Sequence, residues 1–203
     1  MAITTIVFDL GGVLVDFDAK RSLSTHFSPE YHNLINEKTF TSETWKLMDK
    51  GDLEVEEAIE IMCRDLPSEL HDEVSKMVLD HEGEMPPIEE MYPIVKKLRE
   101  KGYRIYLLSN CPSWFDEFKK SVPALDFFDG FIISAKYNLI KPGKEIFNVL
   151  FNEFSLKADE CFFIDDSPAN IATAKELGMS AHCFSKHSIN ELIDALQNAD
   201  VNI

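Results

Sequence analysis

A short apolar segment that ends in an aspartate and two glycines constrains the fold of this chain most. The first strand is predicted over residues 3–8, whose β-branched and apolar side chains are typical of a strand buried on both faces of a parallel sheet. Asp9 then lies at the carboxyl end of that strand, where open α/β sheets bind their ligands. Gly11 and Gly12 follow and allow the backbone to approach a ligand closely. The segment therefore predicts a reactive loop.

Length and composition favour a soluble globular protein. The chain has 203 residues, of which 45% are hydrophobic and 28% are charged, enough for one sizeable core or for a core domain with a smaller insertion. No stretch predicts a membrane span, and the N-terminal residues lack the pattern of a secretory signal. We therefore expect a cytoplasmic protein.

Acidic residues dominate the charge, most of all in one part of the chain. The formal net charge of the chain is −16, and the net charge of residues 17–85 alone is −10. Such a surface repels nucleic acid and anionic membranes, so neither is expected as a partner. A divalent cation suits it better.

The cysteines and histidines show no metal-ligand spacing. Four cysteines are widely separated, which favours reduced thiols, and Cys111 is predicted to be a small, partly buried filler. The six histidines are scattered singly, which favours surface positions or hydrogen-bonded core positions.

Residues 18–84 show only helical patterns. Val55, Ala58, Ile59 and Met62 form an amphipathic stripe, and a second stripe follows after Pro67. We predict an inserted helical cap domain over residues 17–85. The core domain then comprises residues 1–16 and 86–203.

From residue 88 onward, helices and strands alternate. Further strands are predicted at 103–108, 131–133, 161–164 and, more weakly, 180–184, with helices between and after them. Repeated strand–helix units indicate a parallel sheet with right-handed crossovers. The predicted fold class is α/β, a Rossmann-like parallel sheet with helices on both faces and an inserted all-helical cap.

Polar side chains recur at or shortly after the ends of these predicted strands, and they are Asp9, Ser109, Asn110, Lys141, Asp165 and Asp166. The carboxyl ends of parallel strands meet at one edge of a sheet, so we expect these side chains to share a site. Their chemistry fits phosphoryl transfer. A carboxylate can attack phosphorus to form an aspartyl phosphate, and we assign this role to Asp9.

The other residues fit supporting roles in that reaction. Lys141 can balance the charge of the nucleophile and of the phosphoryl oxygens, while Mg²⁺ can be held by Asp9 with Asp165 and Asp166. Either member of the acidic pair has an alternative role in orienting the other.

Phosphate needs hydrogen-bond donors as well. Ser109 and Asn110 offer a hydroxyl and an amide, although capping a helix is their alternative role. Backbone N–H groups of Gly11 and Gly12 add further donors.

In combination, these motifs identify the chain as a member of the haloacid dehalogenase-like (HAD) hydrolase superfamily with a helical cap of the C1 type. The matching segments are residues 8–16, 108–110, 141–147, 163–170 and 174–179. The resemblance implies a Mg²⁺-dependent phosphatase with Asp9 as nucleophile and metal ligand. It also implies that the Gly11 carbonyl and Asp166, with Asp165 beside it, hold the metal, that Ser109 or Asn110 holds phosphate, and that Lys141 stabilises charge.

One position departs from the family pattern. Phosphatases of this family usually carry a second aspartate two residues after the nucleophile as the general acid and base, and here that residue is Gly11. General acid–base catalysis contributes about 10²–10⁴-fold to the rate. Substitutes for the missing acid are Asp16, Asp18 or a cap side chain, although ending the loop into the cap is the favoured role for Asp16 and Asp18.

The Asp-Leu-Gly form of the first motif resembles a subset of bacterial sugar-phosphate phosphatases, including enzymes that act on α-glucose 1-phosphate. An anomeric leaving group departs readily and depends less on an acid, and the acidic cap suits a compact, neutral leaving group. We therefore expect a small-molecule phosphate ester as substrate, most of all a sugar phosphate.

Two alternatives remain beside the phosphatase. Without the usual acid, the chain is alternatively a catalytically weak protein that binds a phospho-ligand or a partner. A metal-free dehalogenase is disfavoured, because Asp165 and Asp166 would place unbalanced negative charge beside Asp9. Arg21 and Trp45 are expected to pack within the cap rather than to face substrate, and Asn170 is a candidate to orient Asp166.

Overall fold

The computed structural model of the chain describes residues 2–186 and 188–203. Its centre is one sheet in the order β3-β2-β1-β4-β5, and all four neighbouring pairs are parallel. The predicted α/β class with an all-parallel sheet is confirmed. The strands are β1 (Thr5–Phe8), β2 (Arg104–Ser109), β3 (Gly130–Ile133), β4 (Cys161–Asp165) and β5 (Ser180–Cys183).

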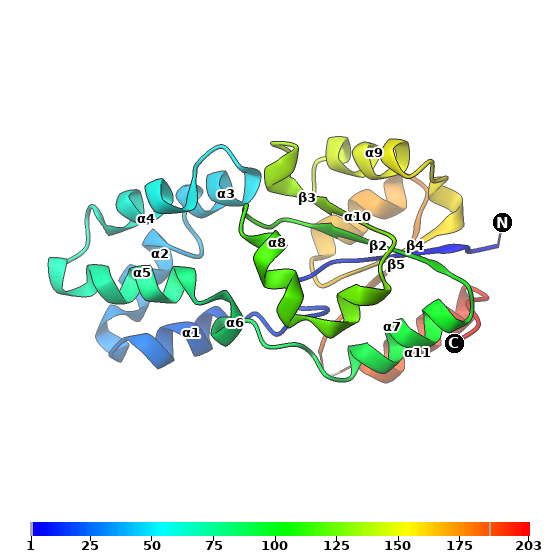
Figure 1. Cartoon of the computed structure of the whole chain (residues 1–203), viewed down its shortest axis with the longest axis horizontal. Helices are drawn as coiled ribbons and strands as arrows, with labels where there is room; N and C mark the ends of the chain where they lie inside the picture. Colours follow the sequence, from blue (N-terminus) through cyan, green and yellow to red (C-terminus); the bar gives the residue numbers. More distant parts are fainter. Residues whose placement is uncertain (1, 187) are drawn as a thin grey trace.

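Helices cover both faces of the sheet (Figure 1). Successive side chains of a strand point to opposite faces, and in β1 Ile6 and Phe8 join one apolar cluster while Val7 joins another. The first cluster is shared with α7 (Met91–Glu100), α8 (Phe115–Phe118) and α11 (Ile189–Asn198). The second is shared with α9 (Lys144–Glu153) and α10 (Pro168–Glu176).

A helical insert follows β1 and packs around an apolar cluster of its own. Met48, Ala58 and Val74 are fully or almost fully buried in that cluster, and Trp114 from the sheet domain packs against its edge. In Figure 1 the insert extends from the end of the sheet domain at which β1 ends. Its helices are α1 (Ala19–His26), α2 (His32–Lys38), α3 (Glu43–Lys50), α4 (Val55–Cys63), α5 (His71–Leu79) and α6 (His81–Glu84).

The ends of α3 fix the position of this helix. Ser42 caps its N-terminus by accepting a hydrogen bond from the Trp45 backbone N–H. Gly51 ends the helix in the left-handed conformation, with φ of +80°, and lies directly against the backbone of Ala135, which follows β3. The Asn138 amide also donates to the Gly51 carbonyl at 3.0 Å. The C-terminal end of α3 is therefore docked on the sheet domain.

The chain crosses between the sheet domain and the insert twice, and the two crossings run side by side. The Asp16 N–H donates to the Pro86 carbonyl at 2.8 Å, and the Ile88 N–H donates to the Leu14 carbonyl at 2.9 Å. This short antiparallel contact joins both connections at one junction.

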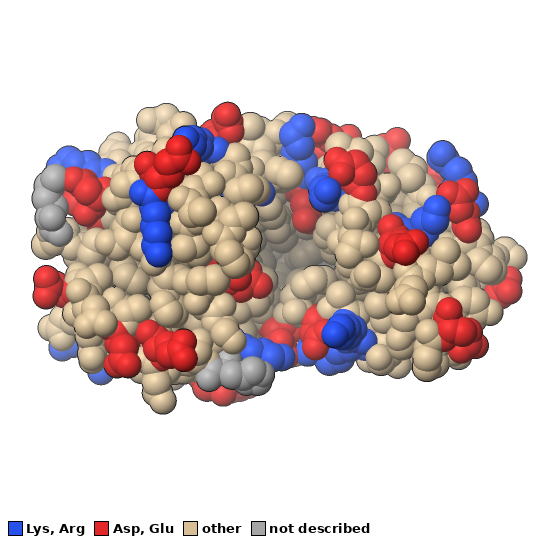
Figure 2. Space-filling model, turned by 180° about the vertical axis from the view of Figure 1, so that it is seen from behind, with Lys and Arg blue, Asp and Glu red and all other residues tan. Residues whose placement is uncertain are grey.

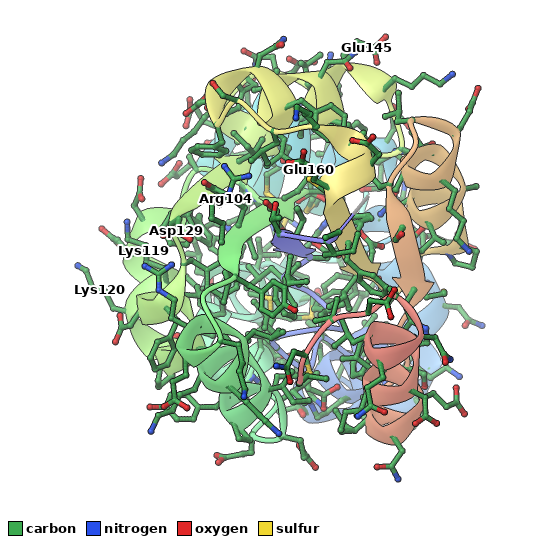
Figure 3. The ribbon with its side chains drawn as sticks, turned by 90° about the vertical axis from the view of Figure 1, so that its right-hand side faces the viewer. Arg104, Lys119, Lys120, Asp129, Glu145 and Glu160 are labelled. Carbon is green, nitrogen blue, oxygen red and sulfur yellow. The ribbon has the colours of Figure 1, made fainter. Side chains whose placement is uncertain are left out.

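The opposite end of the sheet carries ordinary surface ion pairs. Figure 3 views the molecule from that end, with Arg104 and Glu160 labelled where β2 and β4 begin. Asp129 accepts hydrogen bonds there from Arg99 and from the Ile105 N–H. These hydrogen bonds hold the first residues of β2 in place.

The cysteines are free, as predicted. Cys111 is 2% exposed and belongs to the core, so it is more deeply buried than the sequence indicated. Within the described residues, no helix combines the length and the apolar character needed to cross a membrane.

Candidate active site

Three carboxylates meet at the carboxyl end of the sheet. Asp9 directly follows β1, Asp165 is the last residue of β4, and Asp166 comes next. These two strands are direct neighbours, with Phe8 opposite Ile164. The Asp9 N–H continues this pairing by donating to the Ile164 carbonyl at 2.9 Å. Ligand oxygens of the three carboxylates consequently lie within 4.8 Å of one another. The sheet register itself assembles the cluster.

Lys141 joins this cluster from the segment after β3. Its Nζ lies 2.8 Å from Asp9 Oδ1 and 2.6 Å from Asp165 Oδ2, and its side chain is only 1% exposed. Although burial alone would lower it, the two carboxylates raise the pKa of Lys141, so the ammonium stays charged. Among the described residues, three carboxylates thus share one ammonium, and the excess negative charge favours a bound cation.

The two aspartates of the acidic pair have different environments. Each oxygen of Asp165 accepts two hydrogen bonds, from donors on Lys141, Asn170 and the Ser167 backbone. Asp166 is exposed. Asn170 was a candidate to orient Asp166, but both of its hydrogen bonds go to Asp165.

Two carboxyl groups of this cluster, those of Asp9 and Asp166, are hard to ionise in the absence of a cation. Burial raises the pKa of Asp9 to about 7, which Lys141 opposes and the charge of Asp165 reinforces. Partial burial of its carboxyl group and the Asp165 charge also raise the pKa of Asp166. Both shifts are those expected of oxygen ligands gathered for a positive ion.

The two loop glycines serve different purposes. Gly12 has φ of +70°, and a Cβ there would lie 2.4 Å from Asp166 Oδ2, so glycine leaves the space that the Asp166 carboxylate occupies. Its N–H donates to the Val15 carbonyl at 2.8 Å, which corrects the expectation that Gly12 offers a free donor to phosphate. Gly11, by contrast, has open space where a Cβ would be.

Ser109 and Asn110 follow β2 beside the cluster. The Ser109 side chain is buried, and within the described residues its hydroxyl makes one long contact, 3.4 Å, to the Asn110 carbonyl. The Asn110 amide binds the Lys141 backbone twice, accepting from its N–H at 2.8 Å and donating to its carbonyl at 3.0 Å. Asn110 thus holds the Lys141 segment in place. Neither residue caps a helix, because α8 begins later, after Trp114.

A cavity of about 150 Å³ lies between this edge of the sheet and the insert. Figure 2 shows the molecule hollowed between its two lobes, with acidic side chains at the margin of the hollow. The lining residues come from the first loop, from the loop after β2 and from the insert; they include Gly11, Ser109, Asn110, Trp45, Asp49, Met85 and Trp114.

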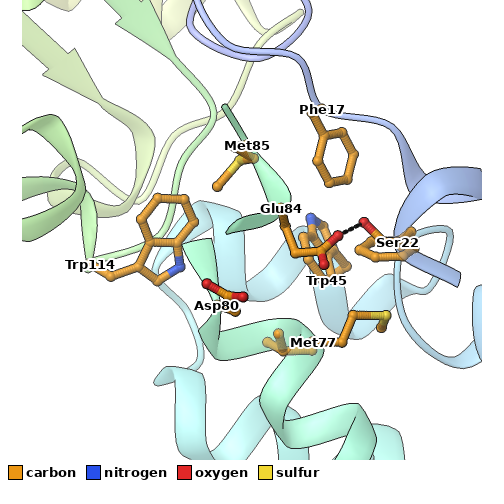
Figure 4. Close-up of a pocket in the computed structure, with 10 residues that line it drawn as sticks. Phe17, Ser22, Trp45, Met77, Asp80, Glu84, Met85 and Trp114 are labelled. Atoms are coloured by element: carbon orange, nitrogen blue, oxygen red, sulfur yellow. Dashed lines mark hydrogen bonds between the residues drawn. The ribbon is translucent and has the colours of Figure 1, made fainter. Parts of the chain in front are cut away.

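Aromatic and thioether side chains extend the cavity wall into the insert (Figure 4). Phe17, Trp45, Met85 and Trp114 line both this cavity and a narrow pocket beside it. At the far side of that pocket, the Ser22 hydroxyl donates to the Glu84 carboxylate. Trp45 therefore faces the cavity as well as packing in the insert, where only packing was favoured.

The candidates for a substitute acid in the first loop are engaged elsewhere. Asp16 binds Arg21 at 2.6 Å and Lys186 at 2.9 Å; although burial opposes the shift, these cations lower its pKa. Asp18 caps α1 by accepting from the Lys20 and Arg21 N–H groups. Both residues hold the entry to the insert, as favoured, and Arg21 serves the same junction.

Asp49 on α3 is the site residue that the sequence reasoning did not name. Its half-buried side chain lines the cavity together with Gly11 and Trp45. Burial, reinforced by the charge of Asp9, raises the pKa of Asp49 to about 7. The sequence offered one signal for Asp49: it comes four residues after Trp45, which places both side chains on the same face of a helix.

Comparison with known proteins assigns the family. The family model for haloacid dehalogenase-like hydrolases matches residues 3–178. The chain belongs to the haloacid dehalogenase-like hydrolases. As a HAD-like hydrolase it shares its fold with a protein from Porphyromonas gingivalis described as a predicted HAD-like family hydrolase, with a TM-score of 0.73, 24% identity, and coverage of 97% of this chain and 99% of that one.

Phosphatases are among the relatives of this HAD-like hydrolase. D-ribitol-5-phosphate phosphatase from Bacteroides thetaiotaomicron is 27% identical over 87% of this chain and 89% of its own length. Sesquiterpene phosphatase astK from Aspergillus oryzae is 27% identical over 85% of each chain. A HAD family enzyme from Bacteroides thetaiotaomicron, solved with magnesium and inorganic phosphate, has a TM-score of 0.67 and 27% identity over 89% of this chain and 93% of that one.

Proposed function

We propose that this HAD-like hydrolase is a Mg²⁺-dependent phosphatase that acts on a small phosphorylated metabolite through an aspartyl phosphate on Asp9. The observation that carries the proposal is the cluster of Asp9, Asp165 and Asp166 with the buried Lys141 at the carboxyl end of the sheet. Such a cluster offers a nucleophile, oxygen ligands for a cation and a fixed positive charge. The phosphatases among its relatives support the same activity.

The residues fit a magnesium ion. Asp9, Asp166 and the Gly11 carbonyl are the proposed ligands, and the missing Cβ of Gly12 leaves space for the Asp166 carboxylate. Asp165 is instead saturated with hydrogen bonds, so we assign it to positioning Lys141 and assign the metal to Asp166. When bound, Mg²⁺ would offset the negative charge of phosphate and carboxylates.

The remaining predicted residues hold the phosphoryl group. The Ser109 hydroxyl is proposed to donate to a phosphate oxygen and the Lys141 ammonium to stabilise the charge on that group. Asn110 positions Lys141 through its backbone, and the second hydrogen of its amide group is proposed to remain for phosphate.

We assign residues 17–85 to a cap and residues 1–16 with 86–203 to the core domain. The separate apolar cluster of the insert and the paired connections at residues 14–16 and 86–88 support this division. A cap placed over the reacting groups would exclude water and select the leaving group. The cytoplasmic location and the C1 type of the cap remain predictions.

A sugar phosphate is the proposed substrate. The cavity of about 150 Å³ is smaller than the about 300–1,000 Å³ of sites that enclose drug-sized ligands, which favours a compact leaving group. The aromatic lining favours a second candidate, a phosphate ester of an apolar alcohol like those implied by the relative astK. That candidate requires the insert to move away from the sheet domain.

A substrate panel tests the proposal. Phosphate release from α-glucose 1-phosphate, D-ribitol-5-phosphate and an isoprenyl monophosphate is measured with and without Mg²⁺, beside Asp9→Asn. We expect Mg²⁺-dependent turnover of a sugar phosphate by the wild type and loss by at least about 10³-fold in the variant. A protein that releases no phosphate from any of them fits the alternative of a catalytically weak binding protein.

A further inference from the structure

The proposed phosphatase lacks a general acid in its first loop. Cleavage of a phosphate ester leaves an alkoxide unless the leaving oxygen receives a proton, and Gly11 has no side chain to give one. Asp16 and Asp18 are bound to the junction and to the start of α1. Another part of the molecule must therefore supply the proton.

Asp49 lies on the insert side of the 150 Å³ cavity, whose other side is formed by the sheet domain. Its side chain, with Gly11, Ser109 and Asn110, lines the space in which the phosphate and its leaving group would lie. We infer that Asp49, a residue of the insert, is the general acid and base of this enzyme and replaces the carboxylate that Gly11 lacks. This inference rests on the proposed phosphatase function.

The position of Asp49 is fixed by contacts that reach the sheet domain. Its backbone carbonyl accepts a hydrogen bond from the buried Ser134 hydroxyl, which also accepts from the Cys111 N–H at 2.8 Å. Cys111 directly follows Asn110, so one buried hydroxyl joins α3 to the predicted phosphate-binding loop. Gly51 and Asn138 hold the end of the same helix, two residues after Asp49. Such anchoring is what a positioned acid needs.

The charged and titratable groups around Asp49 suit a proton donor. Burial and the charge of Asp9 raise the pKa of Asp49 to about 7, while the side chains of Trp45 and Lys141 oppose the shift. The Cys111 thiol faces it with a pKa raised by burial, and stays neutral. A carboxyl group with this pKa can give a proton and take it back near neutral pH.

The proposed cycle balances in two steps. Asp9 attacks phosphorus, the bond from phosphorus to the leaving oxygen breaks, and that oxygen takes the proton of Asp49 to leave as an alcohol. The Asp49 carboxylate then takes a proton from water as that water attacks the phosphorus of the aspartyl phosphate. The bond to Asp9 breaks, inorganic phosphate leaves, and both carboxyl groups return to their initial states.

Leaving-group dependence tests the inference with Asp49→Asn. A good leaving group departs without an acid, so kcat/KM for nitrophenyl phosphate should change little, while kcat/KM for D-ribitol-5-phosphate should fall by about 10²–10⁴-fold. With nitrophenyl phosphate the variant should also accumulate phosphorylated enzyme, because the second step loses its base. Asp65→Asn is the matched control, since Asp65 is an exposed insert aspartate paired with Lys38.

The possible results separate the two proposals. A wild type that turns over neither these two esters nor any ester of the panel above with Mg²⁺ refutes the phosphatase function. An active wild type whose Asp49→Asn variant loses nothing, or loses both esters equally, overturns the role of Asp49 alone. Asparagine has almost the same size and shape as aspartate, so the melting temperature should remain that of the wild type. If it falls, Asp49→Ser is compared by the same ratio of the two esters.

Discussion

The two walls of the cavity are built in different ways. The wall from the sheet domain includes Gly11, Ser109 and Asn110, and it adjoins the buried network of ion pairs and hydrogen bonds among Asp9, Lys141 and Asp165. We call this wall, together with that network, the sheet wall. The wall from the insert, the insert wall, carries Phe17, Trp45 and Met85 and, among the lining residues of this cavity, one carboxyl group, that of Asp49. The sheet wall fits binding and attack on a phosphoryl group. The insert wall fits choice and protonation of the leaving group.

This difference also shows how the chain compensates for Gly11. The usual acid would stand on the sheet wall, and the space for it is open. The structure instead presents a carboxyl group from the insert wall, which therefore becomes part of the chemistry as well as a cover. Substitutions on each wall test this division of roles, and the largest effect is expected at Lys141.

Removing the ammonium of the sheet wall should have the largest effect. Lys141→Met leaves Asp9 and Asp165 buried without their cation, so we expect a loss of unfolding free energy of about 3–5 kcal/mol and no measurable turnover. The exposed pair of Lys144 with Glu176 is the control, and Lys144→Met should cost less than about 1 kcal/mol. Equal losses in urea unfolding would contradict a special role of the buried network.

Returning an acid to the sheet wall should restore an enzyme that lacks the acid of the insert wall. Apart from its chain neighbours, no heavy atom of the described residues lies within 4 Å of a Cβ at Gly11, so Gly11→Asp is accommodated. In the Asp49→Asn background we expect it to raise kcat/KM for D-ribitol-5-phosphate by at least about 10-fold and to leave that for nitrophenyl phosphate nearly unchanged. A uniform loss on both esters would show that the loop requires glycine.

The two glycines of the first loop should respond in opposite ways to alanine. Gly12→Ala adds a Cβ at φ of +70° against the Asp166 carboxylate, so we expect Mg²⁺ to bind about 10–100-fold more weakly. Gly11→Ala meets open space and should leave Mg²⁺ affinity unchanged. Titration of Mg²⁺ followed by calorimetry measures both, and a tolerated Gly12→Ala would rule out our placement of the metal at Asp166.

The smallest effect is expected inside the insert, at His26. Burial by itself would lower the pKa of His26. Hydrogen bonds to Glu73 at 2.7 Å and to Glu84 at 2.9 Å outweigh burial and raise this pKa above 6.5. A raised folded-state pKa stabilises the protein below the unfolded value, and this contribution is lost as pH rises through the folded value. His26→Gln should therefore lower the melting temperature by a few degrees at about pH 6 and less at about pH 9. A larger difference at the higher pH would contradict the assignment.

The sheet wall was predictable from sequence because strand ends place residues by a simple rule. An apolar run followed by a polar residue fixes both the strand and the edge at which the side chain lies, and this rule located Asp9, Ser109, Asp165 and Asp166. The hydrogen-bond partners of these residues could not be predicted from the sequence. That Asn170 binds Asp165, or that Gly12 makes space for Asp166, depends on distances that only the folded chain sets.

The insert wall was not predictable in the same way. Its helices follow from their amphipathic stripes, but those stripes do not say which side of a helix faces the sheet domain. Asp49 is one of many acidic residues in the insert, and only the docking of α3 through Gly51 and Ser134 distinguishes it. Asp16 and Asp18 were nearer in sequence to Asp9, yet ion pairs and a helix cap occupy them.

The central claim, covalent catalysis at Asp9, is tested most directly by identifying the phosphorylated residue. Wild-type enzyme and Asp9→Asn are mixed with Mg²⁺ and excess nitrophenyl phosphate, quenched in acid during turnover and analysed by peptide mass spectrometry. We predict that the wild-type peptide containing Asp9 gains the mass of one phosphoryl group and that the variant peptide does not. Steady turnover with an unmodified Asp9 peptide, or with the phosphoryl group on another residue, would contradict this account.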